Sequence, residues 1–187
     1  MHNGGRNNKT GTSGGSGGAI HPEEYQTFGH INSWNYINAT DIGKRMTFTS
    51  IWNLFDFAVS GRNEGGTPGI NDKGLVTRDR KTKKDAFYLY KCAWNPEPEV
   101  HIISSRWKER DTKDITITVL SNCDKVALYQ NDELVQTLEK STDPKNGVVW
   151  SFNPVPFQKE TDTFRAVGFK NDKIVKENTA TFSTTNK

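Results

Sequence analysis

Residues 51–76, IWNLFDFAVSGRNEGGTPGINDKGLV, join an apolar run to a long polar loop. The run contains Trp52 and predicts a buried strand, but a strand that only fills a core usually ends in a short turn. The loop carries Arg62, Asn63 and Glu64, whose side chains can exchange hydrogen bonds or form an ion pair. Because parallel α/β folds place their chemistry at the carboxyl ends of strands, this loop is the first candidate for a functional site.

The sequence does not indicate metal or nucleic-acid chemistry. The four histidines form no HExxH pattern, and Cys92 and Cys123 lack both CxxC spacing and a nearby histidine. We therefore expect no metal, no other cofactor and no disulfide framework. The basic stretch TRDRKTKK, at 77–84, has no accompanying aromatic and glycine signature, so we expect a solvated face and no nucleic-acid partner.

Length and composition allow one or two domains in the 187 residues. A hydrophobic content of 33% and a mean hydropathy of -0.77 are low for a compact globule. Part of the deficit lies in residues 1–18, a Gly/Asn/Ser-rich segment that we expect to be flexible. That segment has no apolar run typical of a signal peptide, and no later run could span a bilayer. We expect a soluble chain without a membrane partner, and its compartment stays open.

Residues 21–94 predict the order helix, strand, long loop, helix. In the first helix, His21 is expected at the cap and Pro22 at the first helical position. Apolar side chains then recur about every three residues and predict one apolar stripe: Tyr25, Phe28, Ile31, Trp34 and Ile37. The run RMTFTSIWNLFDFA, residues 45–58, predicts a strand covered on both sides, as in a parallel sheet.

The second helix follows the loop. Thr82 and Asp85 form a capping-box-like pair, and Phe87, Tyr90 and Trp94 recur at helical spacing. The sequence NPEP then predicts the end of this helix.

Residues 100–187 have a different pattern, with eight short strand candidates separated by polar turns. The stretches YQNDEL and FKNDKI both place Asn-Asp between two strands, where a β-hairpin turn needs residues that tolerate positive φ. This spacing of short strands is typical of an immunoglobulin-like sandwich. The Cys–Trp–Cys signature of antibody domains is absent.

The stretch WNLFDFAVSGRNEGGTPGINDKGLVTRDRKTKKDAFYLYK, which begins at Trp52, resembles glycoside hydrolase family 2, the β-galactosidase type. It is similar to the end of that family's catalytic TIM barrel. HPEEYQ resembles the helix before the last barrel strand, and NPEPEVHI resembles the exit into an immunoglobulin-like domain. The resemblance covers roughly residues 19–187. It implies a multidomain chain: flexible 1–18, the C-terminal βα part of a TIM barrel at 19–99, and an immunoglobulin-like β-sandwich at 100–187.

The resemblance also implies a chemistry, the retaining hydrolysis of β-galactosides or related glycans by two glutamates about 5–5.5 Å apart. Trp52 resembles the tryptophan that forms a floor for the sugar, since a flat ring suits the apolar face of a pyranose. Filling the barrel is the alternative role for Trp52. Arg62, Asn63 and Glu64 are expected either to bind sugar hydroxyls or to brace the loop through an Arg–Glu pair. Asp56 is expected to be a structural acceptor.

Neither glutamate of the family is found at its expected place. The nucleophile segment would lie just before HPEEYQ, where the chain has Ser13 followed by Gly14, and Glu23 and Glu24 belong to the helix start. We therefore expect no catalytic residue in this chain and no activity from it alone. The chain is expected to be a fragment of a periplasmic or cytoplasmic glycosidase, with the missing N-terminal part of the barrel as a partner.

A second hypothesis is a non-catalytic carbohydrate-binding or docking module built on the β-sandwich. In this hypothesis, aromatic side chains of the second half stack on sugars. The candidates are Trp107 and Tyr129, whereas Trp150 is expected in the core because VVWSF predicts a strand.

Overall fold

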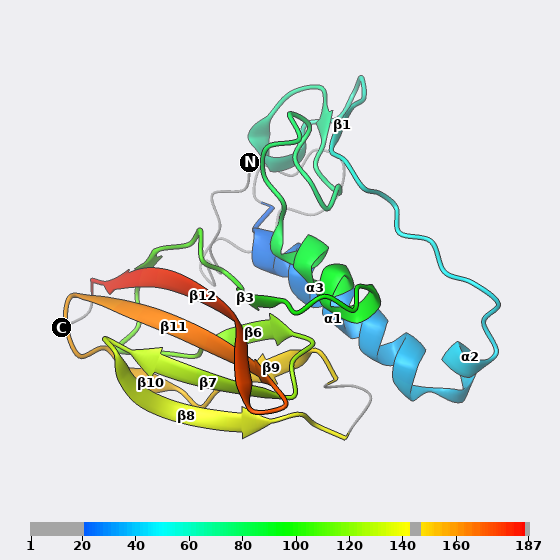
Figure 1. The fold of residues 1–187 in the computed structure, drawn as a ribbon. Coiled ribbons are helices and arrows are strands. Elements are labelled where there is room, and N and C mark those ends of the chain that lie inside the picture. The colour runs from blue at the N-terminus through cyan, green and yellow to red at the C-terminus, as the bar shows by residue number, and fades with distance from the viewer. Residues whose placement is uncertain (1–20, 143–146, 186–187) are drawn as a thin grey trace. The chain divides into compact units, whose positions relative to one another are not determined.

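The computed structural model describes residues 21–142 and 147–185. The predicted flexible segment 1–18 lies outside the described residues. The described part is mostly β-sheet with few helices (Figure 1). The chain forms two compact units, unit 1 (Met1–Tyr88) and unit 2 (Leu89–Lys187). None of the helices in the described part has both the length and the apolarity that crossing a bilayer would need.

Unit 1 begins with helix α1, Glu23–Ala39, followed by the short helix α2, Asp41–Lys44. The helix is where the sequence predicts it, but Pro22 occupies the cap position and His21 lies before it. The predicted apolar stripe is also wrong in part, because Tyr25 is 69% exposed. The buried face of α1 instead contains Glu23, Glu24, Thr27 and Ile31, and Glu23 is buried because its carboxylate accepts the Asp85 N–H.

The region after α2 differs most from its prediction. Residues 47–56 form no regular strand, and strand β1 spans only Phe57–Ala58. Phe48 is 81% exposed, so the expectation of a strand covered on both sides is wrong. The physical reason is that the described residues supply no neighbouring strand to cover this segment.

Strand β1 pairs with β2, Ile70–Asn71, in antiparallel register with Phe57 opposite Asn71. The short 3₁₀ helix η1, Glu64–Gly66, lies in the loop between them. An isolated parallel bridge joins Phe55 to Val76, so the end of the apolar run is held next to the end of the loop.

Helix α3, Asp85–Trp94, confirms the second predicted helix and its end before NPEP. The predicted capping box is wrong, since Thr82 lies outside the cap position. The backbone N–H of Asp85 donates instead to the Glu23 carboxylate at 2.6 Å. Because a carboxylate is stabilised at the positive end of a helix, Glu23 performs the capping from α1, 62 residues away in the chain.

Unit 2 is built from strands that form separate sheets, with β11 and β12 as a long hairpin (Figure 1). A five-stranded sheet has the order β4-β12-β11-β7-β8, a three-stranded sheet the order β3-β6-β9, and β10 pairs with β5. The strands are β3 Val100–Ile102, β4 Glu109–Arg110, β5 Asp114–Ile115, β6 Thr118–Ser121, β7 Lys125–Gln130, β8 Glu133–Glu139, β9 Val149–Ser151, β10 Val155–Pro156, β11 Thr161–Lys170 and β12 Lys173–Thr184.

Both predicted Asn-Asp turns are confirmed. Asn131 and Asp132 join β7 to β8 with φ of 50° and 69°, and Asn171 and Asp172 join β11 to β12 with φ of 49° and 59°. Positive φ at both central residues gives the twist that two-residue hairpins require. The last two predicted strands are one continuous strand, β12, because its polar middle pairs with β11 along the whole hairpin.

One apolar core is enclosed by residues from both larger sheets of unit 2. Phe164 and Phe182 are fully buried there, and Trp150 is 4% exposed, as predicted for a core tryptophan. The indole N–H of Trp150 donates to the Ser121 carbonyl at 3.0 Å, so its polar atom is satisfied in the interior.

The two cysteines are free thiols and both are buried in unit 2. Burial raises the pKa of Cys92 to about 12, and the nearby Glu99 carboxylate adds to the shift. Burial also raises the pKa of Cys123. Both side chains therefore behave as small apolar groups at neutral pH.

Candidate functional site

Trp52 lies on the surface of unit 1, with 75% of its side chain exposed. Its ring meets the edge of Phe57 in a T-shaped contact, with centroids 6.2 Å apart and planes at 85°. The next peptide groups are fixed, because the Leu75 N–H donates to the Asn53 carbonyl at 3.0 Å. Trp52 is therefore an exposed aromatic side chain, and the backbone that follows it is held in place by a hydrogen bond.

The loop between β1 and β2 is closed by its own backbone. The Val59 N–H donates to the Gly69 carbonyl at 3.0 Å, and the Gly69 N–H donates to the Arg62 carbonyl at 2.7 Å. Gly61 and Gly69 have φ of 79° and 73°, a backbone conformation that favours glycine. The loop is thus a defined structure that can hold side chains in place.

Glu64 is the buried centre of this loop, with 1% of its side chain exposed. Arg62 Nη1 donates to its Oε1 at 2.5 Å, and Lys73 Nζ lies 3.5 Å from the same oxygen. The second oxygen, Oε2, accepts the Asp72 N–H at 3.0 Å. Burial raises the pKa of Glu64, but the Arg62 and Asp72 hydrogen bonds and the Lys73 charge outweigh it, so the net pKa is lowered. Glu64 is a carboxylate anchored within the protein.

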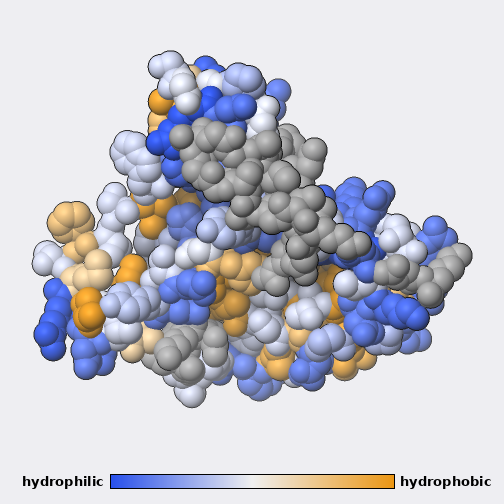
Figure 2. Space-filling view, turned by 180° about the vertical axis from the view of Figure 1, so that it is seen from behind, coloured by the Kyte–Doolittle hydropathy of each residue, from blue (hydrophilic) through white to orange (hydrophobic). Residues whose placement is uncertain are grey.

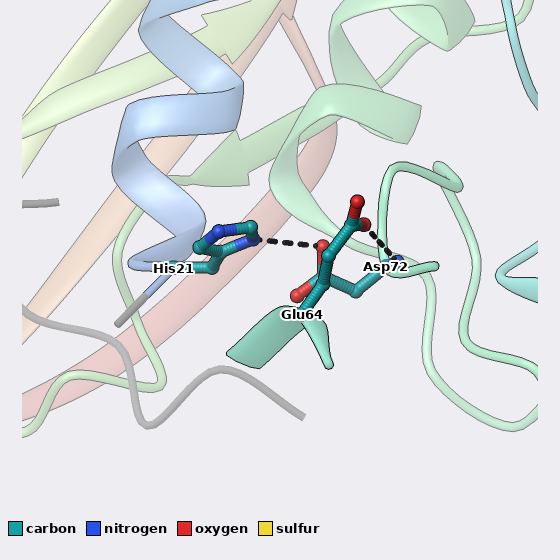
Figure 3. Close-up of side chains that lie close together, drawn as sticks. All are labelled: His21, Glu64 and Asp72. Carbon is teal, nitrogen blue, oxygen red and sulfur yellow. Dashed lines mark hydrogen bonds and ion pairs between the residues drawn. The ribbon is translucent and has the colours of Figure 1, made fainter. Parts of the chain in front are cut away.

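His21, Glu64 and Asp72 form a compact cluster (Figure 3). His21 Nδ1 lies 3.0 Å from Asp72 Oδ1, which links the residue before α1 to the loop. One potential ligand atom from each side chain lies within 4.8 Å of the others, a spacing that could hold a metal ion. Arg62 and Lys73 already neutralise Glu64, so a metal cation would compete with two positive charges. We therefore assign the cluster a structural role, which is to hold the loop against the start of α1.

A buried ion pair lies next to the cluster. Lys84 Nζ lies 2.8 Å from Asp56 Oδ1 and also donates to the Asp72 carbonyl at 2.6 Å. Asp56 Oδ1 additionally accepts the Gly74 N–H at 2.8 Å. Burial raises the pKa of Asp56, and the Lys84 contacts only partly offset that effect. The prediction of Asp56 as a structural acceptor is confirmed.

The structure thus brings together some of the sequence-predicted residues. Arg62 and Glu64 form the predicted internal pair, whereas Trp52 is connected to the loop through Phe57 and β1. Asn63 precedes η1 and makes no side-chain capping bond there. A sugar-binding role for Trp52, Arg62, Asn63 and Glu64 stays a prediction.

Sequence reasoning missed the partners that fix the loop: His21, Asp72, Lys73 and Lys84. His21 and Asp72 are 51 residues apart, and Lys84 and Asp56 are 28 apart. No local pattern predicts such contacts. A weak signal was present for Lys84, because a lysine directly before a helix start is poorly suited to the helix dipole and needs an acidic partner.

In unit 2, the aromatic residues proposed for sugar stacking have other partners. The Arg110 guanidinium lies 3.9 Å from the centroid of Trp107, and that of Arg165 lies 4.4 Å from the centroid of Tyr129. Trp150 is buried. One face of each of the two more accessible rings is therefore covered by a cation.

Similar proteins were found by sequence and by structure. A family model described as a domain of unknown function, DUF4982, matches residues 112–176. A β-glucuronidase of Bacteroides fragilis is 39% identical over 131 residues. The crystal structure of an FMN-binding β-glucuronidase from Facaelibacterium prausnitzii L2-6 covers 89% of this chain, at 32% identity and a TM-score of 0.75. A candidate β-galactosidase from Bacteroides fragilis covers 96% of it, at 28% identity and a TM-score of 0.81.

The homologues of this chain are family 2 glycoside hydrolases. The resemblance read from the sequence is therefore confirmed, and the chain matches a C-terminal segment of such enzymes. The match covers 70% of this chain but only 18% of the Bacteroides fragilis β-glucuronidase. It covers 24% and 26% of the two solved family 2 chains.

Proposed function

We propose that this chain supplies one wall of the sugar site of a family 2 glycoside hydrolase, together with the β-domain that follows it. In this proposal residues 19–99 are the C-terminal βα part of a TIM barrel and residues 100–187 an immunoglobulin-like sandwich. The observation that carries it is an exposed tryptophan, Trp52, beside a rigid polar loop in a segment homologous to glycosidases. A flat ring exposed to solvent suits the apolar face of a pyranose.

The charge of the loop bears on the substrate class. Arg62 and Lys73 have side chains that are 34% and 50% exposed, and both point at the single carboxylate of Glu64. The partly exposed cationic groups of Arg62 and Lys73 lie at the loop surface, whereas the carboxylates of Glu64 and Asp72 are buried. This supports a β-glycoside whose sugar carries a carboxylate, a β-glucuronide, over a neutral β-galactoside.

The chain is proposed to be inactive alone. Retaining hydrolysis needs an acid and a nucleophile about 5–5.5 Å apart. Glu64, the glutamate of the loop, is buried and held by Arg62, Lys73 and the Asp72 N–H, so it is not placed to act as a nucleophile. The remaining part of the barrel, as a partner, would supply the acidic pair.

A chromogenic assay tests the proposal. The full chain should not hydrolyse p-nitrophenyl β-glucuronide or β-galactoside. In a family 2 enzyme that carries this chain in place of its own C-terminal segment, Trp52→Ala should raise KM for the preferred substrate by about tenfold or more. The proposed inactivity would be contradicted if the chain alone hydrolysed either substrate and Glu64→Gln abolished that hydrolysis. An unchanged KM in the chimera would contradict the role of Trp52.

A further inference from the structure

Residues 77–83 of unit 1 form a turn that carries a group of exposed cations. Its basic side chains are all exposed: Arg78, Arg80, Lys81 and Lys83. Asp79 supplies one negative charge against these four positive ones. In Figure 2, blue hydrophilic atoms predominate at the top of the view, in the part of unit 1 that carries β1 in Figure 1. We refer to residues 77–83 as the basic turn.

The backbone of the basic turn is fixed by its own hydrogen bonds. The Thr77 N–H donates to the Thr82 carbonyl at 2.9 Å, and the Arg80 N–H donates to the Thr77 carbonyl at 2.8 Å. An antiparallel bridge between Val76 and Lys83 closes the base of the turn. The cations are therefore presented by a defined structure, so less ordering entropy is lost when a ligand binds them.

The single carboxylate of the basic turn serves the turn itself. Asp79 Oδ1 accepts the Thr77 hydroxyl at 2.6 Å and the Lys81 N–H at 3.1 Å. These hydrogen bonds, the Thr77 bond foremost, lower the pKa of Asp79. Among the described residues, Arg78, Arg80 and Lys81 form no ion pair with any carboxylate. The three cations are thus available to an external anion.

Arg80 is oriented by two contacts. Its guanidinium lies 4.1 Å from the centroid of the Phe55 ring, and its Nη1 donates to the Arg78 carbonyl at 3.1 Å. The ring covers one face of the guanidinium, and the carbonyl uses one of its N–H groups. The side chain is otherwise exposed, and a guanidinium held in this way can donate two parallel hydrogen bonds to a carboxylate.

A short stretch of chain leads from the loop between β1 and β2 to the basic turn. Its backbone is held beside the residues that follow Trp52, since the Leu75 N–H donates to the Asn53 carbonyl at 3.0 Å. Lys73 and Arg78 flank this stretch, and their Cα atoms are at most about 18 Å apart, because five residues span no more. The cations of the loop and of the turn therefore lie at two ends of one stretch that runs beside Trp52.

We propose that the basic turn binds a glycan chain that carries carboxylates on several of its sugars, while a terminal sugar of that chain contacts Trp52. This inference rests on the proposed function and deepens it, because it names an acidic polysaccharide as the substrate class. A single uronate has one carboxylate and engages one of the two cationic positions. A chain with repeated carboxylates engages the loop and the turn together, and the second contact adds to the first.

Nucleic acid is the alternative polyanion, and it fits less well. Proteins bind single strands by stacking the bases on aromatic rings. Phe55 and Phe87 are in contact with the cations of the turn, and each has one ring face covered. Arg80 covers Phe55, and Lys83 Nζ lies 5.1 Å from the centroid of Phe87. A glycan needs only charge and hydrogen bonds from the turn, since its ring contact is at Trp52.

The test measures the binding of oligosaccharides to the full chain by isothermal titration calorimetry. The probe is a hyaluronan oligosaccharide, in which β-linked glucuronate alternates with a neutral amino sugar. The matched control is the same oligosaccharide with its carboxyl groups reduced to alcohols. We expect the charged form to bind at least about tenfold more tightly than the reduced form and than free glucuronate, with an affinity that falls as salt is added.

Two double variants locate the binding surface. Arg78→Gln combined with Arg80→Gln should weaken binding of the charged oligosaccharide by about tenfold or more, because charge-assisted hydrogen bonds are lost. Lys173→Gln combined with Lys176→Gln removes the same charge from exposed side chains of unit 2 and should change the affinity by less than about twofold. All four side chains are exposed, so thermal denaturation should show the same melting temperature for both variants and the unchanged chain.

Equal binding of the charged and reduced oligosaccharides, equal binding of free glucuronate, or equal weakening by the two double variants would overturn the inference. Tighter binding of a DNA oligonucleotide or a sulfated dextran with the same number of negative charges would also overturn it, in favour of a phosphate or sulfate ligand. The chimeric enzyme gives an independent result. An unchanged KM for Trp52→Ala there contradicts the proposed function, whereas the titrations of the chain alone decide the binding by the basic turn.

Discussion

The two units of this chain bury different kinds of side chain. Among the described residues of unit 2, 22 apolar residues are buried against 7 polar or charged ones. In the described part of unit 1 the ratio reverses, with 4 apolar and 10 polar or charged residues buried. Unit 2 therefore derives its stability from an apolar core, whereas unit 1 is held by ion pairs and hydrogen bonds and displays its apolar side chains. The comparison teaches that the described residues of unit 1 are held in place mainly by polar contacts.

The largest expected effect tests the core of unit 2. Trp150→Ala should lower the free energy of unfolding by about 3–5 kcal/mol, because a large buried ring leaves a cavity and the Ser121 carbonyl loses its donor. Urea denaturation followed by circular dichroism measures the change. Ile174→Ala, on an exposed side chain of the same unit, should stay within about 0.5 kcal/mol. A loss below about 1 kcal/mol for Trp150→Ala would show that unit 2 does not depend on this core.

The next effect tests the buried ion pair of unit 1. Lys84→Met should cost about 3 kcal/mol at neutral pH, because it leaves the buried Asp56 carboxylate without its cation. Hydrogen exchange at the Asp56 and Gly74 amides measures the local free energy of opening. The matched control is Lys44→Met, which removes a pair with Asp41 whose side chains are 70% and 80% exposed and should cost less than about 0.5 kcal/mol. Equal effects of the two variants would show that the buried pair holds unit 1 together no more strongly than an exposed pair.

A smaller effect concerns pH. The pKa of Glu64 is lowered from 4.5 in the folded chain, so the unfolded chain takes up this proton first as the pH falls. The stabilisation from Glu64 is present above about pH 4.5 and is lost as the pH falls through the folded pKa. Glu64→Gln should therefore cost about 1–3 kcal/mol at pH 7 and less at low pH. Urea denaturation across this range measures it, with Glu133→Gln on an exposed strand as the control. A pH-independent difference would contradict the ion-pair role.

The smallest effect completes the comparison. Trp52→Ala in the chain alone should change the free energy of unfolding by less than about 0.5 kcal/mol, because the side chain is 75% exposed. Thermal denaturation of this variant beside Trp150→Ala compares two tryptophans from the two units. A loss of more than about 1 kcal/mol for Trp52→Ala would mean that the tryptophan already packs within unit 1, against the proposed sugar contact.

Several sequence predictions that rest on contacts between near neighbours in the chain were confirmed, whereas contacts between residues far apart in the chain were missed. Both Asn-Asp hairpins and the end of α3 were predictable, because a turn or a proline acts on its immediate neighbours. The cap of α3 was not, because Glu23 reaches it from a distant helix. The strand expected at 45–58 has the right alternation but lacks its neighbours, so the pattern predicts a state that the described residues cannot complete. The candidate loop was found, and the residues that hold it were not.

The position of the two cysteines has a practical consequence. Unit 1 contains no cysteine, and both thiols of unit 2 are buried with raised pKa values. An alkylating reagent can reach them only when the structure around them opens, so the rate of modification reports that opening. The two thiols are thus built-in probes of local opening that need no added label.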